Sequence, residues 1–88
     1  MDYLLFTYPN CAKCDDLKAY LRGASIPAEV HDVAAKDGRM RIRSFLPHVR
    51  RDERGSIILP TLICAEDGRV AAVHNNREEF AAWWQSRG

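Results

Sequence analysis

The feature that most constrains the fold of this chain is a pair of cysteines, Cys11 and Cys14, placed where one sequence pattern gives way to another. Residues 3–8 form a short apolar run rich in strand-forming side chains, and this run stops just before the pair. From Cys14 onward, apolar residues recur at helical spacing, with Leu17 and Leu21 three and seven positions later. We therefore expect the two cysteines to lie in the turn between a buried strand and an amphipathic helix.

Downstream of this helix the chain predicts a second strand and a second helix. Residues 28–33 favour a strand, and apolar residues keep helical spacing from Lys36 to about Leu46. Pro47 leaves the end of that helix open, because proline inside a helix costs ~3 kcal/mol or more. Either the helix ends near Phe45, or Pro47 begins a further turn.

The last part of the chain predicts a hairpin followed by a helix. Residues 57–64 are strongly strand-like, residues 66–68 are typical of a tight turn, and residues 70–74 form the return strand. A final helix is expected over residues 77–86. The predicted order is β-α-β-α-β-β-α in one α/β domain over residues 1–88. The first two strands should be parallel and the last two antiparallel, in a four-stranded mixed sheet.

Composition and charge argue against several function classes. Hydrophobic residues make up 47% of the 88 residues, and the formal net charge is +1, so neither a nucleic acid nor a membrane is an expected partner. The apolar run after Met1 is too short for a signal peptide or a membrane span. Three cysteines are too few for a disulfide framework. We expect a cytoplasmic protein and, by default, a monomer.

The position of the cysteine pair suits thiol chemistry. The first amides of a helix lack internal partners, and the helix dipole places roughly +0.5 charge there. The pKa of Cys11 should therefore fall below the ~8.5 of a free thiol, helped by Lys13 and opposed by Asp15 and Asp16. Cys14 belongs to the apolar helix face and should be the more buried of the two. We expect Cys11 to attack or be attacked by a substrate disulfide, and Cys14 to resolve the mixed disulfide.

Two further residues bear on this interpretation. Pro60 stands inside the strand-like run, where it would lose a ladder hydrogen bond, and a cis Leu59–Pro60 peptide at the start of the strand would explain its presence. Cys64 is expected to be a buried, inert thiol, although a regulatory disulfide is an alternative.

Zinc needs four ligands, and only Cys64 and three scattered histidines remain besides the pair. Redox chemistry is therefore favoured over half of a zinc site, and no metal ligands are assigned.

Three segments together resemble glutaredoxin-like proteins of the thioredoxin fold, over nearly the whole chain. They are Phe6-Thr7-Tyr8-Pro9-Asn10-Cys11-Ala12-Lys13-Cys14, Leu59-Pro60-Thr61 and Asn75-Asn76-Arg77-Glu78. The resemblance implies a thioredoxin-like fold and a thiol–disulfide oxidoreductase that reduces protein or glutathione mixed disulfides without a bound cofactor. Glutathione or thioredoxin reductase would supply the electrons, and a disulfide-containing protein would be the substrate.

The resemblance also implies roles for individual residues. Cys11 and Cys14 would be catalytic. The substrate-binding residues would be Tyr8, Lys13, Leu59, Pro60, Asn76 and Arg77. In the family, the residue before the cis-proline offers backbone hydrogen bonds to glutathione or peptide. The start of the last helix holds the carboxylate of the γ-glutamyl group.

The chain departs from the family at two places. Ala12-Lys13 replaces the usual Pro-Tyr between the cysteines, and Asn75-Asn76 replaces a Gly-Gly pair. Because asparagine tolerates left-handed backbone angles, the second turn is expected to survive. Two other hypotheses stay open: an iron–sulfur-binding or redox-sensing module without enzymatic activity, and a relative of arsenate reductases.

The remaining polar and aromatic residues have simpler interpretations. A cationic run is expected to form a solvated helix face, or else to dock an acidic partner; it consists of Lys36, Arg39, Arg41, Arg43, Arg50, Arg51 and Arg54. No aromatic residues interleave with these charges as nucleic-acid stacking would need. His31, His48 and His74 are expected at the surface. Trp84 should be in the core and Trp83 partly exposed.

Overall fold

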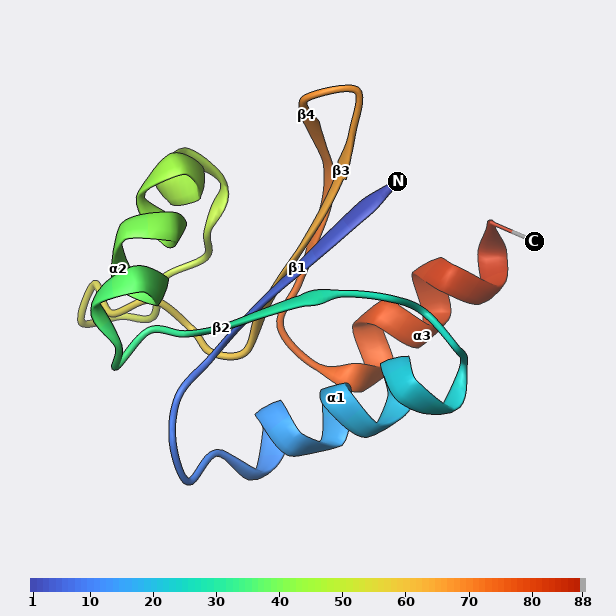
Figure 1. Ribbon diagram of the computed structural model, residues 1–88, viewed down its shortest axis with the longest axis horizontal. Helices are drawn as coiled ribbons and strands as arrows, with labels where there is room; N and C mark the ends of the chain where they lie inside the picture. Colours follow the sequence, from blue (N-terminus) through green and yellow to red (C-terminus); the bar gives the residue numbers. More distant parts are fainter. Residues whose placement is uncertain (88) are drawn as a thin grey trace.

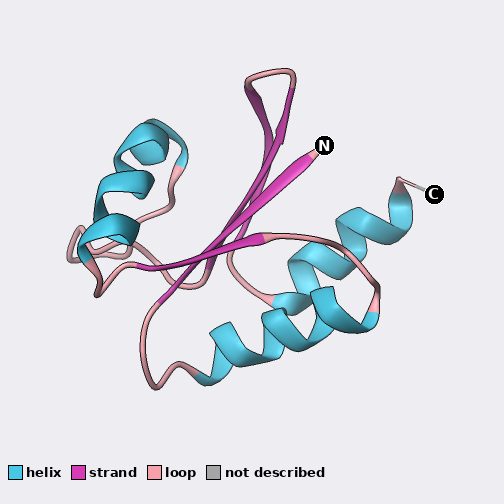
Figure 2. Cartoon of the chain, viewed as in Figure 1, coloured by secondary structure: helices cyan, strands magenta, loops and turns pink. Residues whose placement is uncertain are grey.

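The computed structural model describes residues 1–87, and the predicted order of elements is confirmed (Figures 1 and 2). A 3-10 helix, labelled η1, follows the second α-helix. The elements are β1 (Asp2–Thr7), α1 (Ala12–Gly23), β2 (Glu29–Asp32), α2 (Lys36–Ile42), η1 (Arg43–His48), β3 (Thr61–Glu66), β4 (Arg69–His74) and α3 (Arg77–Ser86).

The four strands form one mixed sheet in the order β2-β1-β3-β4. As predicted, β1 and β2 are parallel and β3 and β4 are antiparallel, while β1 and β3 are also antiparallel. Phe6 near the end of β1 is opposite Thr61 at the start of β3, and Leu62 is opposite His74 at the end of β4. The segments that follow β1, precede β3 and follow β4 therefore emerge at the same end of the sheet.

Helices α1 and α3 lie together on one side of the strands, and α2 lies on the other (Figure 1). The α1/α3 side has the larger core, made of Tyr3, Leu5, Leu17, Leu21, Ile26, Leu62, Cys64 and Phe80. Phe80 joins the two helices, because its ring meets Tyr3 at 6.0 Å and Tyr20 at 5.9 Å, both edge to face. Trp83 and Trp84 are both only partly buried, so Trp84 is less deeply buried than expected.

The α2 side has a smaller core of Leu4, Phe6, Ile42 and Ile63. Here α2 packs directly on the backbone of β2, because a Cβ atom built on Gly38 would overlap the carbonyl oxygen of Asp32. Only glycine permits this approach. The helix of 7 residues thus lies directly on β2, and the rest of this core is covered by later residues, among them Phe45 and Ile57.

Two predicted boundaries were wrong. The second helix does not run to Leu46: its α-helical part ends at Ile42, and the chain continues as the 3-10 helix that contains Pro47. Pro47 lies next to the end of that helix, where the missing N–H and the ring disturb little further structure. The predicted strand 57–64 begins only at Thr61, and Ile57 instead makes an isolated bridge with Arg51.

His74 was wrongly expected at the surface. The hairpin register places it opposite Leu62 at the end of β4, where it is 8% exposed. Its ring packs against Phe80 and Trp83, with centroids 5.7 and 5.3 Å away, and its Nε2 is buried without a hydrogen-bond partner among the described residues. Burial lowers the pKa of His74, although the charge of Glu79 opposes this effect.

No helix within residues 1–87 combines the length and apolar character that crossing a membrane requires.

Candidate active site

The cysteine loop, residues 8–14, connects β1 to α1 at the end of the sheet described above. Asn10 has a left-handed backbone with φ of 58°, a conformation that asparagine tolerates better than most residues. This turn puts Cys11 at the N-cap of α1, where its Sγ accepts a hydrogen bond from the N–H of Cys14 at 3.1 Å. The backbone carbonyl of Cys11 accepts from the N–H of Asp15. The Cys11 sulfur thus satisfies one of the free amides of the helix.

The two cysteines are close enough to form a disulfide. Their sulfur atoms are at bonding distance and their Cα atoms are 5.2 Å apart, within the usual range for a disulfide. Cys14 is 1% exposed and Cys11 is half-buried. Cys11 is therefore the more accessible of the two cysteines, and Cys14 the more buried, as expected from the sequence.

The start of α3 lies against the first turns of α1. The guanidinium of Arg77 is 3.5 Å from a carboxylate oxygen of Asp16, and it also pairs with Glu78. A hydrogen bond from its own backbone amide lowers the pKa of Glu78, and the cations Arg77 and Lys13 lower it further. Of the two cations expected at the site, Arg77 pairs with carboxylates of both helices, and Lys13 acts on Glu78 through its charge.

The proline loop, residues 57–61, lies at the same end of the sheet. The Leu59–Pro60 peptide is cis, as predicted, and Pro60 is buried while Leu59 is half-buried. The pairing of Thr61 with Phe6 places this loop beside the end of β1, from which the cysteine loop departs. Among residues 1–87, no hydrogen bond involves the N–H or C=O of Leu59.

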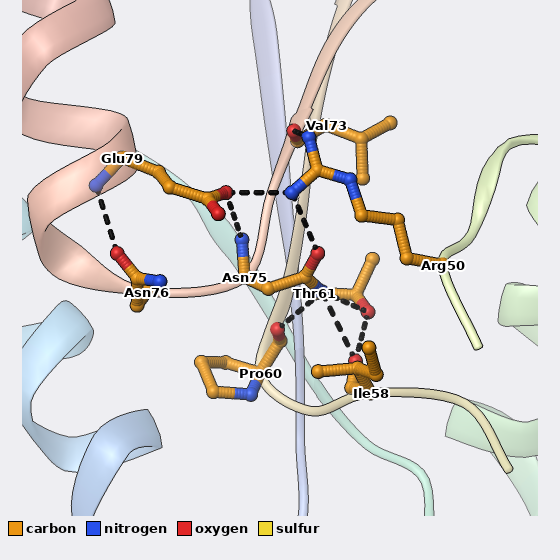
Figure 3. Close-up of polar contacts among 8 residues, drawn as sticks. All are labelled: Arg50, Ile58, Pro60, Thr61, Val73, Asn75, Asn76 and Glu79. Carbon is orange, nitrogen blue, oxygen red and sulfur yellow. Dashed lines mark hydrogen bonds and ion pairs between the residues drawn. The ribbon is translucent and has the colours of Figure 1, made fainter. Parts of the chain in front are cut away.

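Asn75 holds the proline loop in place. Its side-chain nitrogen donates to the carbonyls of Ile58 at 3.1 Å and Pro60 at 3.0 Å, and lies 3.3 Å from the hydroxyl of Thr61 (Figure 3). The hydroxyl of Thr61 itself donates to Ile58 at 2.6 Å. The carbonyls on both sides of Leu59 are therefore bound from within the molecule.

Arg50 and Glu79 in turn hold Asn75. The guanidinium of Arg50 donates to the side-chain oxygen of Asn75 at 3.2 Å, to Glu79 at 2.8 Å and to the carbonyl of Val73 at 3.2 Å (Figure 3). The Glu79 carboxylate also accepts the backbone N–H of Asn75 at 3.1 Å. Partial burial favours the protonated form of Glu79, but the hydrogen bonds from Asn75 and Arg50 outweigh it and lower the pKa of Glu79. We call Asn75, Arg50 and Glu79 the clamp.

Asn76 begins α3 by capping it. Its backbone is extended, with φ of −157°, and its side-chain oxygen accepts from the N–H of Glu79 at 2.8 Å. Neither Asn75 nor Asn76 has a left-handed backbone, so the expectation that they replace glycines for that reason was wrong. The two residues are used for their side-chain amides.

The other expected residues are placed as follows. Tyr8, the first residue of the cysteine loop, is 55% exposed. Cys64 is fully buried in β3, as expected, and burial raises the pKa of its thiol to about 12, which makes it unreactive at neutral pH. Within residues 1–87, no group of three or more histidine, cysteine or acidic residues is arranged to hold a metal ion.

Sequence reasoning missed the clamp. The Arg50 side chain is 50% exposed, in keeping with the solvated cationic run, but the expectation did not include its contacts with Asn75 and Glu79. Asn75 was expected only as a turn residue. An asparagine next to the expected start of the last helix, with a glutamate four residues later, was the available signal. The sequence alone does not show that these residues meet the proline loop, because the hydrogen bonds join residues 14 to 29 positions apart.

Comparison with known proteins supports the fold. No protein-family model matches the chain, and no curated protein sequence matches it. Among solved structures, the chain is similar to a mutant form of the thioredoxin-like protein BC3987. The TM-score is 0.61 with 21% sequence identity, over 92% of this chain and 96% of that one. At this identity the match confirms the thioredoxin-like fold and carries no further information on activity.

Proposed function

We propose that this protein is a glutaredoxin-like thiol–disulfide oxidoreductase that uses Cys11 and Cys14 as its reactive pair. The proposal depends chiefly on one observation: the half-buried Cys11 sulfur accepts the Cys14 N–H at the start of α1 and lies at disulfide distance from the buried Cys14 sulfur. An amide donor and a helix N-terminus stabilise a thiolate, which is the reactive form of cysteine.

The reaction follows from the different exposure of the two sulfurs. The Cys11 thiolate attacks one sulfur of a substrate disulfide, forms a mixed disulfide, and releases the other substrate sulfur as a thiolate that takes up a proton. Cys14 then loses its proton and attacks the Cys11 sulfur, which releases the second substrate thiol. Two electrons pass to the substrate, and the protein is left with the Cys11–Cys14 disulfide.

The proline loop offers a place for the substrate backbone. Because the N–H and C=O of Leu59 make no internal hydrogen bond among the described residues, they are free to pair with an extended substrate segment beside the cysteines. Tyr8, Lys13 and Arg77 are exposed side chains around the same region. We infer that disulfides of proteins are the substrates and that mixed disulfides with glutathione are a second class.

The electron donor is proposed to be glutathione or thioredoxin reductase, with no bound cofactor. At the start of α3, Asn76 caps the helix and Arg77 pairs with Asp16. A glutathione carboxylate would have to replace the contacts of Arg77 or use the amides that Asn76 leaves free. Glutathione as the donor therefore requires these groups at the start of α3 to bind its carboxylate. Each donor can be tested in the absence of the other.

The test is turnover of a protein disulfide, with glutathione or with NADPH and thioredoxin reductase as the source of electrons. We expect activity with at least one donor and loss of that activity in Cys11→Ser. Cys64→Ala, which removes only the buried thiol, is the matched control and should keep the wild-type rate. Undiminished turnover in Cys11→Ser would reject the assignment. Activity with the reductase alone would exclude glutathione as the donor.

A further inference from the structure

The clamp binds the proline loop on both sides of Leu59, which the proposed exchange of disulfides does not itself require. The side-chain nitrogen of Asn75 donates to the carbonyls of Ile58 and Pro60, the two neighbours of Leu59 (Figure 3). Leu59 itself has no backbone hydrogen bond among residues 1–87. Asn75 is 6% exposed, so water does not compete for these bonds. A single side chain thus binds the carbonyls of the residues before and after Leu59, while the N–H and C=O of Leu59 itself stay free among the described residues.

The rest of the clamp determines the orientation of the Asn75 amide. Arg50 donates to its oxygen, which leaves only the nitrogen to face the proline loop. The backbone carbonyl of Arg50 also accepts the N–H of Ile58 at 3.0 Å, so the same residue holds the loop from its other side. Glu79 accepts from both Arg50 and the Asn75 backbone, which ties the clamp to α3.

We propose that Asn75, oriented by Arg50 and Glu79, is a positioning residue that presents the free backbone groups of Leu59 to the main chain of a protein substrate. This role rests on the proposed function. It predicts selectivity by substrate type: a protein disulfide with an extended segment uses Leu59, whereas a small disulfide without a peptide backbone reacts at Cys11 and makes no use of the clamp.

The first experiment compares two disulfides in the wild type and in Asn75→Asp. This change keeps the shape and the acceptor for Arg50 but replaces the donor nitrogen by an oxygen that faces two carbonyls. With a protein disulfide, we expect kcat/KM to fall about tenfold, the equivalent of one net hydrogen bond, mainly through KM. With bis(2-hydroxyethyl) disulfide and the reduced protein as the only thiol, so that no glutathione mixed disulfide forms, the rate should stay within about twofold of the wild type, an effect well below one hydrogen bond.

Ile26→Ala is the matched control, because Ile26 is buried beyond the far end of α1 in a core cluster whose buried members include no residue of either loop or of the clamp. It should change the two rates in the same proportion. Arg50→Lys, which keeps the charge and loses the planar fork, should give a smaller loss with the protein disulfide only. If Asn75→Asp does not fold, the role of Asn75 is tested by the rates of Arg50→Lys with the two disulfides: a loss with the protein disulfide alone supports it, and equal losses with both overturn it.

A readout independent of turnover is backbone amide exchange. In Asn75→Asp we expect the amides of Ile58 and Thr61 to exchange at least about tenfold faster, whereas those of Leu5 in β1 should follow only the change in global stability. Equal losses of rate with both disulfides, or unchanged exchange in the proline loop, would overturn the role of Asn75 while leaving the oxidoreductase intact. A wild-type protein that reduces neither disulfide would instead overturn the proposed function itself.

Discussion

The cysteine loop and the proline loop lie at the same end of the sheet, yet they are held in different ways. In the cysteine loop, the defining hydrogen bond joins Cys14 to Cys11, three positions away. In the proline loop, the bonds come from Asn75, 14 to 17 positions away, and are supported by Arg50. One half of the site is therefore encoded by local sequence and the other by tertiary contacts, so changes in distant residues should affect the two loops unequally.

The largest effect should come from Phe80, a core residue that lies outside both loops. Phe80 is fully buried and joins α3 to α1 and to His74. Phe80→Ala should lower the free energy of unfolding by about 4 kcal/mol, because the lost contacts and the remaining cavity both cost stability. Urea unfolding followed by circular dichroism measures this. A loss below about 1 kcal/mol would mean that the two helices are held together by other contacts.

Removing the clamp should cost less and should affect mainly the proline loop. Asn75→Ala leaves the buried carbonyl of Pro60 without its side-chain donor, and we expect a loss of about 2 kcal/mol in urea unfolding. Lys13→Ala, an exposed change in the cysteine loop, is the comparison and should stay within about 0.5 kcal/mol. Equal effects of the two changes would contradict the distinction between the loops.

The cysteine loop should respond to its cap rather than to remote residues. Under reducing conditions, Cys11→Ala loses the acceptor for the Cys14 N–H and should be destabilised by about 1 kcal/mol. Cys11→Ser keeps an acceptor at the N-cap and should be nearly as stable as the wild type, although it cannot exchange disulfides. Thermal unfolding of the two variants measures the difference in stability. A Cys11→Ser variant less stable than Cys11→Ala would contradict the role of residue 11 as the N-cap of α1.

The smallest expected effect is a pH dependence of the free energy of unfolding that arises from His74, beside the clamp. The pKa of His74 is lower in the folded protein than in the unfolded chain, chiefly because the ring is buried. The unfolded chain then binds more protons below about pH 6.5, so stability should fall as the pH falls through and below that value. Arg50 and Glu79 are the charged groups that act on this ring. In urea unfolding at a series of pH values, His74→Phe should reduce the loss of stability between pH 7 and pH 5. An unchanged pH dependence in this variant would mean that another group causes it.

Much of the fold could be predicted from the sequence, because it depends on local patterns. The order of strands and helices, the more buried Cys14, the buried Cys64 and the cis Leu59–Pro60 peptide were all expected and are confirmed. Each follows from periodicity, turn residues or the chemistry of proline over a few positions.

The parts that could not be predicted depend on contacts between distant segments. Arg50 looked like one of many solvated cations, and His74 looked like a surface residue at the end of a strand. Only the folded chain shows that Arg50 reaches β4 and α3 and that His74 faces Phe80. The conformation around Pro47, a 3-10 helix, could not be predicted either, because it depends on how this segment packs against the sheet.

The measurement that tests the account most directly is trapping of the mixed disulfide. The Cys14→Ser variant is reduced, mixed with a protein disulfide, quenched with acid and analysed by mass spectrometry with peptide mapping. Because Cys14 can no longer resolve the intermediate, we predict that the adduct accumulates and maps to Cys11. An adduct on Cys64, or equal amounts of adduct in a Cys11→Ser/Cys14→Ser variant, would contradict the assignment of Cys11 as the attacking thiol.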